Sequence, residues 1–193
     1  MENIILKRFK ESSEVKTRFL KENLPKLLDV IKLISHTFEG GNKLFFFGNG
    51  GSAADAQHMA AEFVNRYIMN RPPLPAIALT TDTSILTSVS NDFAFSEIFA
   101  KQLRALGKER DVAIGITTSG NSPNIIKAFE VAKEMGMKTV AFTGNDGGAI
   151  GKMVDFPLIV PSSSTPRIQE AHILIGHILC EMVEHSLFFK VNP

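Results

Sequence analysis

The sequence has one cysteine, almost no net charge and no long apolar run. Cys180 cannot form an internal disulfide, and its apolar neighbours Ile178, Leu179 and Val183 indicate a buried thiol with no redox role. With 21 Lys and Arg against 20 Asp and Glu, the charge balance does not draw the whole chain to nucleic acid or to an anionic membrane. Its apolar runs are far shorter than the roughly 20 residues of a membrane helix, and residues 1–16 lack a signal-peptide core. We therefore expect a cytoplasmic protein without nucleic-acid or membrane partners.

Repeats and low-complexity segments are also missing, which excludes solenoid and disordered architectures. A chain of 193 residues is only a little longer than the roughly 150 residues typical of one domain, and 44% apolar residues are ample for a core. The proline-rich stretch 72–75 is a stiff connector within the domain. We expect one domain over residues 1–193, with N-terminal helices in 1–39 and an α/β core in 40–193.

Short apolar runs alternate with amphipathic stretches along the rest of the chain. Helical spacing covers 4–20 and again 24–34, so two helices are expected before the first strand. Continuously apolar runs are typical of parallel strands covered on both faces, and they occur at 43–47, 76–79, 112–116, 139–142 and 156–160. The intervening helices are expected at 52–69, 83–106, 122–135 and 167–188. This alternation predicts a doubly wound, flavodoxin-like parallel α/β sheet of about five strands.

Two loops at the carboxyl ends of predicted strands carry residues typical of a ligand site. Residues 48–52 (GNGGS) lead into a helix, where glycine permits positive φ and close ligand approach and Ser52 can cap. Residues 117–122 (TTSGNS) also begin a helix, whose free N–H groups and positive dipole end suit an anion. The first loop suits sugar hydroxyls or phosphate, and the second is a candidate phosphate site. Neither has the P-loop or the dinucleotide-binding motif.

Two pairs of polar residues lie on predicted helices. His58 and Glu62 are four residues apart, which places them on one helix face and allows them to chelate a divalent metal. Gln169 and His177 are eight apart, about 12 Å along a helix axis, and cannot easily serve one ion from one straight helix. A distorted helix, two separate sites or a subunit interface would resolve this. The apolar neighbours of His177 are typical of a core histidine.

Seven motifs, taken together and in order, resemble a known family over nearly the whole chain. They are FGNGGS at 47–52, DAQHMAAE at 55–62, NRP at 70–72, NDF at 91–93, TSGNS at 118–122, TGNDGG at 143–148 and RIQEAHI at 167–173. The chain resembles a sugar isomerase (SIS) domain of the phosphoheptose isomerase type. The resemblance implies a zinc-containing homotetramer, with one zinc per subunit and active sites at subunit interfaces. The implied reaction is the aldose-ketose isomerisation of sedoheptulose 7-phosphate to a heptose 7-phosphate, the entry step to the heptose of bacterial surface polysaccharide.

The resemblance also implies roles for individual residues. Glu62 and His177 match the family's acid/base pair, and His58, Glu62, Gln169 and His177 match its zinc ligands. The substrate-binding positions it implies are Asn49, Gly50, Gly51, Ser52, Glu62, Asn91, Asp92, Thr117, Thr118, Ser119, Ser122 and Gln169. Thr117 stands where the family usually has serine, so a hydroxyl is retained.

Three alternatives within the same fold have to be weighed. A related SIS protein binds the bacterial replication initiator without catalysis, and it resembles this chain at 71–81 and 101–107. That relative lacks equivalents of Glu62 and His177, both of which are present here, so the enzyme is favoured. A sugar-phosphate sensor would usually carry a DNA-binding domain, for which 193 residues leave no room. A transaminase-type enzyme would need a catalytic N-terminal cysteine, and Cys180 is the only cysteine.

Overall fold

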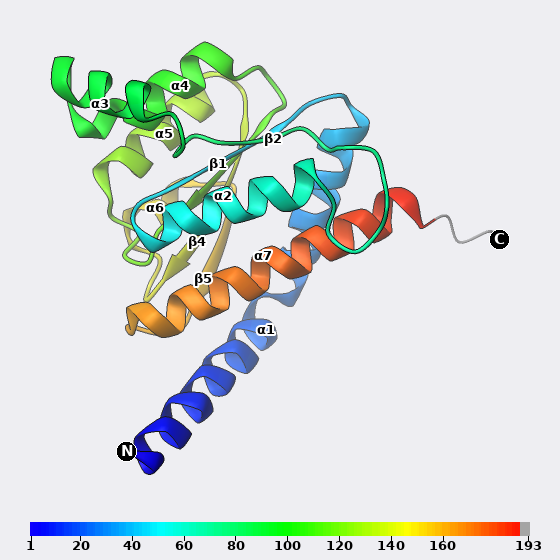
Figure 1. The fold of residues 1–193 in the computed structure, drawn as a ribbon, viewed down its shortest axis with the longest axis vertical. Coiled ribbons are helices and arrows are strands. Elements are labelled where there is room, and N and C mark those ends of the chain that lie inside the picture. The colour runs from blue at the N-terminus through cyan, green and yellow to red at the C-terminus, as the bar shows by residue number, and fades with distance from the viewer. Residues whose placement is uncertain (190–193) are drawn as a thin grey trace.

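The computed structural model describes residues 1–189 and has seven α-helices, one short 3-10 turn and five strands in that part of the chain (Figure 1). The elements in chain order are α1 (Glu2–Glu39), β1 (Leu44–Gly48), α2 (Gly51–Val64), β2 (Ala76–Ala78), α3 (Thr83–Asp92), η1 (Phe95–Glu97), α4 (Ile98–Leu106), β3 (Val112–Ile116), α5 (Pro123–Glu134), β4 (Lys138–Gly144), α6 (Gly148–Met153), β5 (Phe156–Val160) and α7 (Thr165–Phe188). No helix in the described part of the chain is long and apolar enough to cross a membrane.

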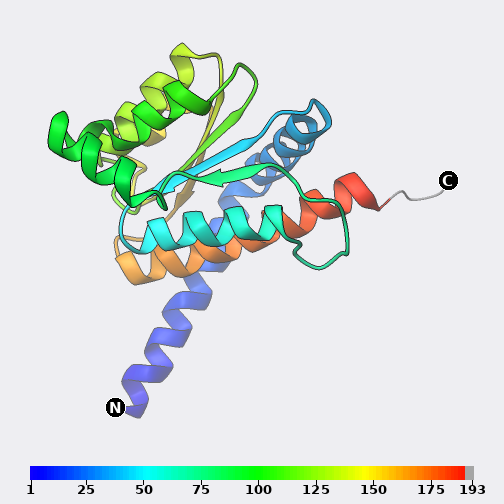
Figure 2. The same ribbon diagram turned by 45° about the horizontal axis from the view of Figure 1, so that its top comes forward.

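The five strands form one parallel sheet in the order β2-β1-β3-β4-β5. This is the flavodoxin-like order, and it confirms the predicted fold class. Side chains alternate between the two faces, so Phe46 of β1 packs with α1, α2 and α7, whereas Phe47 packs with α3, α4, α5 and α6. Figures 1 and 2 show the same two helical layers on either side of the sheet.

The prediction of two N-terminal helices is wrong, because α1 is one helix of 38 residues. Asn23 interrupts the apolar periodicity, yet it lies on the buried stripe, where its amide donates to the Phe19 and Ile159 carbonyls. Pro25 lies on the exposed face, where the hydrogen bond that it cannot donate faces water. Burial along one continuous face therefore overrides the local break.

Three further features of the helices differ from the prediction. The helix expected over 52–69 ends at Val64, and the one expected over 83–106 is divided at Phe93 and Ala94, where the backbone at Ala94 is extended. The short helix α6 was not predicted, since six residues are too few to display a helical period. The strand boundaries were predicted more accurately, and those of β3 and β5 match the structure.

His172 on α7 is buried in the core, with only 1% of its surface exposed. Its Nε2 is 3.0 Å from the carbonyl oxygen of Thr143, at the end of β4, and its ring lies 5.8 Å from that of Phe142. Burial disfavours the charged imidazole and lowers the pKa of His172 from 6.5 to about 4, although the bond to Thr143 opposes this shift. A neutral His172 therefore ties α7 to the end of β4.

Stability should consequently fall as the pH drops from 6.5 towards 4, because in that window the unfolded chain binds a proton that folded His172 does not. The free energy of unfolding should decrease by up to about 3 kcal/mol from this group alone. His172→Gln, which keeps a donor for Thr143 without a titrating ring, should lose less stability over the same window. Urea unfolding of both proteins at pH 7.5, 6 and 5 measures the difference, and equal losses would contradict this interpretation.

Candidate active site

The two predicted ligand loops meet at the carboxyl edge of the sheet, where adjacent strands β1 and β3 send their helices to opposite faces. Such a switch point is where open α/β sheets bind ligands. A reciprocal amide pair joins the loops: Asn49 Nδ2 donates to Asn124 Oδ1 at 2.9 Å, and Asn124 Nδ2 donates to Asn49 Oδ1 at 2.8 Å. Asn124 is buried on α5 and was not among the predicted site residues. Its amide fixes the spacing of the two loops.

Residues 48–51 turn the chain from β1 into α2 through Gly50, whose φ is 55°. The prediction that Ser52 caps this helix is wrong, because Gly50 is the N-cap residue and Ser52 is already inside α2 and buried. The carbonyl of Gly50 accepts the N–H groups of Ala53 and Ala54. The positive φ needed at the cap favours glycine, so the side-chain cap expected at this turn is absent.

Residues 117–122 pass from β3 into α5 and expose hydroxyl groups at the helix start. Ser122 is the N-cap residue and makes no side-chain cap bond; its Oγ lies 3.4 Å from Thr117 Oγ1. Ser119 is exposed, and its Oγ accepts the N–H of Asn121. Gly120 has a φ of 66°. The hydroxyl of Ser122 and the positive end of α5 are thus available to an anion.

Residues 144–150 pack against the 117–122 loop and hydrogen-bond to it. The carbonyl of Gly120 accepts the N–H of Ile150, and the amide oxygen of Asn121 accepts the N–H of Ala149 at 3.0 Å. The two backbones approach so closely that a Cβ on Gly120 would overlap the carbonyl of Gly147. The TGNDGG motif, residues 143–148, therefore supports the 117–122 loop and does not form a separate ligand loop.

His58, Glu62 and His177 converge between α2 and α7, which lie side by side in both views (Figures 1 and 2). His58 Nε2 is 3.0 Å from Glu62 Oε1, and one potential ligand atom from each of the three residues lies within 4.8 Å of the others. The rings of His58 and His177 are 5.1 Å apart and nearly perpendicular. His177 is only partly buried and faces this cluster, so its apolar sequence neighbours do not make it a core histidine.

Two side chains that were not predicted border the histidines. The ring of Tyr67 lies 5.5 Å from that of His177, with the planes tilted by 32°. Asp55 is partly buried on the same face of α2, and burial raises its pKa, although His58 and His177 oppose the rise. The three-residue spacing of Asp55 to His58 could have revealed Asp55. Tyr67 was not predicted as a site residue, because residues 52–69 were expected to form one helix and α2 ends at Val64.

Gln169, Asn91 and Asp92 lie away from this cluster within one chain, and so does Gly51 of the first ligand loop. The Gln169 amide lies at the start of α2, where a Cβ on Gly51 would be 2.5 Å from Gln169 Nε2. Gly51 and His58 are seven residues apart, about 10 Å along the helix. Asn91 and Asp92 lie at the exposed end of α3, on the opposite helical layer (Figure 1). A joint site containing Gln169, Asn91 and Asp92 remains a prediction that needs a second copy of the chain.

The model of the SIS domain family matches residues 8–144. A phosphoheptose isomerase from Thermodesulfovibrio yellowstonii is 53% identical over 188 residues, which cover 97% of this chain and 94% of that protein. The chain belongs to the phosphoheptose isomerases of the SIS domain family. Structures of phosphoheptose isomerases from Neisseria gonorrhoeae and Francisella tularensis align with TM-scores of 0.90 and 0.91, both at 42% identity, covering 95% of this chain and 98% and 97% of those chains.

Membership among the phosphoheptose isomerases confirms the resemblance inferred from the motifs. The alternative of a non-catalytic protein that binds a replication initiator gains no support, since curated relatives at 47–53% identity are phosphoheptose isomerases. Glu62 and His177, whose absence would have favoured that alternative, lie together in the structure.

The donor set of the cluster fits a zinc ion. Two imidazoles and one carboxylate are typical ligands of catalytic zinc, which keeps a further position for water or substrate. Exposure of His58 leaves one side of the cluster accessible. The phosphoheptose isomerase chain therefore has a possible metal site formed by His58, Glu62 and His177.

Proposed function

We propose that this chain converts sedoheptulose 7-phosphate to D-glycero-D-manno-heptose 7-phosphate through an enediol. This would be the first step of ADP- or GDP-heptose synthesis for lipopolysaccharide or other surface polysaccharide. The observation that carries the proposal is the meeting of the Glu62 carboxylate and the His177 imidazole from two different helices, in a chain of the phosphoheptose isomerase family.

The chemistry requires two proton transfers that a carboxylate and an imidazole can divide between them. Glu62 takes a proton from carbon 1 of the open-chain ketose and later returns it to carbon 2. His177 gives a proton to the carbonyl oxygen on carbon 2 and accepts the hydroxyl proton from carbon 1. The carbonyl thereby moves from carbon 2 to carbon 1, and both side chains regain their starting protonation states.

The phosphate of the substrate is assigned to residues 117–122. Thr118, Ser119 and Ser122 supply hydroxyl donors there, and the N-terminus of α5 adds backbone N–H groups and a positive dipole end. Hydrogen bonds to a charged group are the stronger kind, each worth about 1.5–3 kcal/mol. The buried Thr117 hydroxyl, close to Ser122, orients this loop.

Zinc, one ion per subunit, is proposed as the metal. His58, Glu62 and His177 would hold it, with Gln169 as a further ligand if another copy of the chain brings it near. A bound zinc ion supplies Lewis-acid polarisation of the substrate oxygens. Glu62 would then serve both as ligand and as base.

We further propose a homotetramer with active sites at subunit interfaces, acting in the cytoplasm. The separation of Asn91, Asp92 and Gln169 from the histidines within one chain supports shared sites. An unpaired, buried Cys180 is in keeping with a reducing compartment. The domain division, with the helical region in 1–39 and the sugar-phosphate-binding core in 40–193, belongs to the same proposal.

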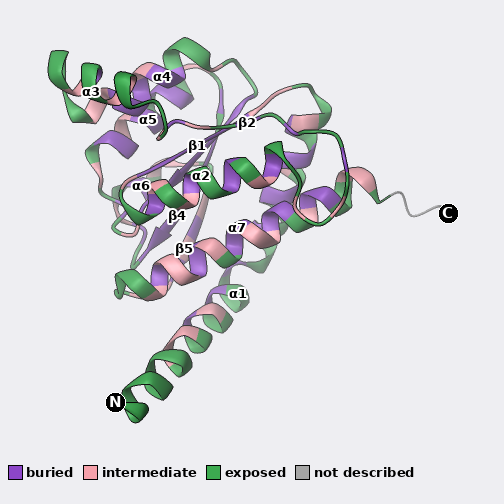
Figure 3. Ribbon diagram, in the orientation of Figure 1, coloured by how far each residue is buried: buried purple, intermediate pink, exposed green. Residues whose placement is uncertain are grey.

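The first turns of α1 should mediate this assembly. They extend from the body and expose Ile4, Ile5, Leu6 and Phe9, the last with 76% of its surface accessible (Figure 3). Contiguous exposed apolar side chains usually mark interfaces. Phe9→Glu should therefore shift the protein from tetramer to smaller species in sedimentation at micromolar concentration, whereas Lys7→Glu in the same region should not. A wild-type monomer under these conditions would contradict the assembly.

The decisive experiment for the reaction is turnover of sedoheptulose 7-phosphate by purified protein in deuterated water. An aldose product carrying deuterium at carbon 2 is expected, because the proton passes through a side chain that exchanges with solvent. Unphosphorylated sedoheptulose is the control and should react far more slowly. Absence of an aldose product would refute the proposed function, and a product without any deuterium would indicate hydride transfer or a fully shielded proton and would count against the role of Glu62.

A further inference from the structure

A buried ion pair lies next to the candidate active site and belongs to none of its predicted residues. Arg71, in the segment that follows α2, and Glu184, on α7, have side chains only 1% and 2% exposed, and Arg71 Nε lies 2.7 Å from Glu184 Oε1. Burying two charges is costly, and apolar replacements for such pairs are often as stable or more stable. A contribution to overall stability alone therefore does not explain why this ion pair is buried here.

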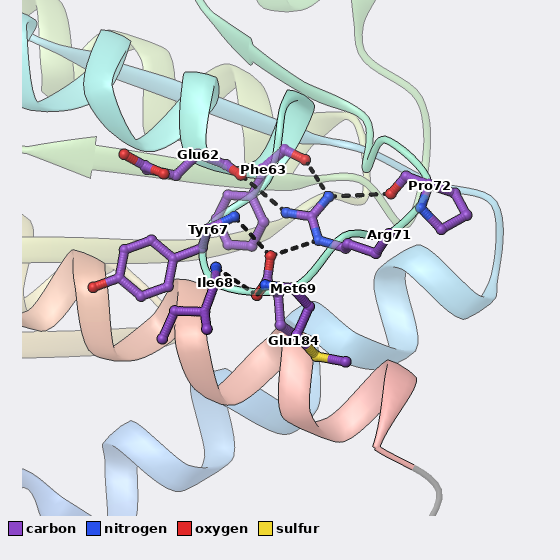
Figure 4. Close-up of polar contacts among 8 residues, drawn as sticks. All are labelled: Glu62, Phe63, Tyr67, Ile68, Met69, Arg71, Pro72 and Glu184. Atoms are coloured by element: carbon purple, nitrogen blue, oxygen red, sulfur yellow. Dashed lines mark hydrogen bonds and ion pairs between the residues drawn. The ribbon is translucent and has the colours of Figure 1, made fainter.

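The Glu184 carboxylate organises the segment after α2. Its Oε1 accepts the N–H of Tyr67 at 2.7 Å, and its Oε2 accepts those of Ile68 and Met69, each at 3.0 Å (Figure 4). Three consecutive backbone donors are thus held by one side chain from α7. This fixes the position of Tyr67, whose ring borders that of His177.

The Arg71 guanidinium binds the end of α2 from the other side. Its Nη2 donates to the carbonyl of Glu62 at 2.9 Å, and its Nη1 donates to those of Phe63 and Pro72 at 2.8 and 3.1 Å (Figure 4). Carbonyls in the last turn of a helix lack partners within the helix. Arg71 donates hydrogen bonds to these carbonyls, including that of Glu62, which carries the catalytic carboxylate. Through its ion pair with Glu184, Arg71 thereby holds the backbone of Glu62 against α7.

The pair therefore reaches both members of the acid/base pair by different routes. One route runs from Arg71 to the backbone of Glu62, and the other from Glu184 through Tyr67 to the ring of His177. Glu184 also lies seven residues after His177 on α7, which places the two on the same helix face. Both routes cross the contact between α2 and α7, which sets the distance between Glu62 and His177.

We propose that Arg71 and Glu184 are positioning residues for the isomerisation, fixing Glu62 and His177 in register across the α2–α7 contact. This inference rests on the proposed function for its catalytic readout. It also has a readout independent of the reaction, because the same two residues belong to the His58–Glu62–His177 cluster that fits a metal. Loosening their register should weaken both turnover and zinc binding.

The test compares Glu184→Gln with Asp111→Asn. Asp111 is a matched control: it is also a buried carboxylate, it pairs with Lys43 and accepts the backbone N–H groups of Lys43 and Lys108, but its hydrogen-bond partners lie in the turns before β1 and β3 and not on α2 or α7. Both variants should melt at lower temperature. Only Glu184→Gln should lower kcat, by about 10- to 100-fold with KM within about twofold, when assayed well below its melting temperature.

Zinc affinity, measured by competition with a chromogenic chelator, provides the second readout. It should fall by about 10- to 100-fold in Glu184→Gln and stay unchanged in Asp111→Asn. Arg71→Lys retains the charge opposite Glu184 but not the forked contact with the α2 carbonyls, so it should show the same losses and replaces Glu184→Gln if that variant does not fold.

Wild-type kcat and zinc affinity in folded Glu184→Gln or Arg71→Lys would overturn the proposal, and so would equal losses in Asp111→Asn. If the wild-type protein fails to convert sedoheptulose 7-phosphate, the proposed function fails, whereas the zinc comparison still decides whether the pair positions the cluster.

Discussion

Glu62→Gln is expected to lower kcat by about 10²- to 10⁴-fold, the range typical of losing a general acid or base. Glutamine keeps the size of the side chain and one oxygen beside His58, but it cannot accept the carbon-bound proton. The variant should still fold, assemble and bind the sugar phosphate. Steady-state kinetics together with calorimetric binding of sedoheptulose 7-phosphate would separate these properties.

Two further variants distinguish proton transfer from metal binding. His58→Ala removes one ligand and leaves the base, so it should lose zinc and regain part of its activity in excess metal. Excess zinc should not restore Glu62→Gln. His177→Gln should also lose most of its turnover, because glutamine cannot carry a proton near neutral pH. Near-normal turnover in both Glu62→Gln and His177→Gln would exclude the mechanism.

Gly120→Ala should lower kcat/KM by about 100-fold or more, mainly through KM. The added Cβ would overlap the Gly147 carbonyl, and neither backbone can move without separating the 117–122 loop from its support. Displacing two hydroxyl donors from the phosphate removes charge-assisted bonds worth about 1.5–3 kcal/mol each. Kinetics with the phosphorylated sugar would report the loss.

Gly41→Ala is the matched control for this change. Gly41 also has a positive φ, 73°, but a Cβ there would meet nothing within 4 Å, and the residue lies in the turn between α1 and β1, away from the site. Both substitutions incur the left-handed backbone cost of about 1–2 kcal/mol in stability. Only Gly120→Ala should change KM, and an unchanged KM there would move the phosphate elsewhere.

Features fixed by neighbouring residues could be predicted from the sequence. The strands were recognisable because two-sided burial makes them continuously apolar, and the ligand loops because glycine and hydroxyl residues follow two of these strands. The spacing of His58 and Glu62 placed them on one helix face. In each case the information lies within a few residues of the feature.

Features set by distant segments could not be predicted in this way. The polar residue in the middle of α1, Asn23, is accommodated in the buried face by donating to the carbonyl of Ile159, 136 residues away. The carbonyls in the last turn of α2 are bound by Arg71, which is itself held by Glu184, 113 residues further along the chain. His177 faces the site only because α2 and α7 pack in one particular register. No local period records such a register.

The pairing of α1 with α7 also constrains how the protein can fold during synthesis. Phe19 of α1 and Ile175 of α7 border the same apolar groove, yet α7 is translated long after α1. Ribosomes add about 5–20 residues per second, so the apolar face of α1 stays exposed for roughly 10 to 30 s before α7 has been synthesised. During that interval the nascent chain exposes a surface suited to chaperones or to α1 of a neighbouring nascent chain on the same messenger RNA.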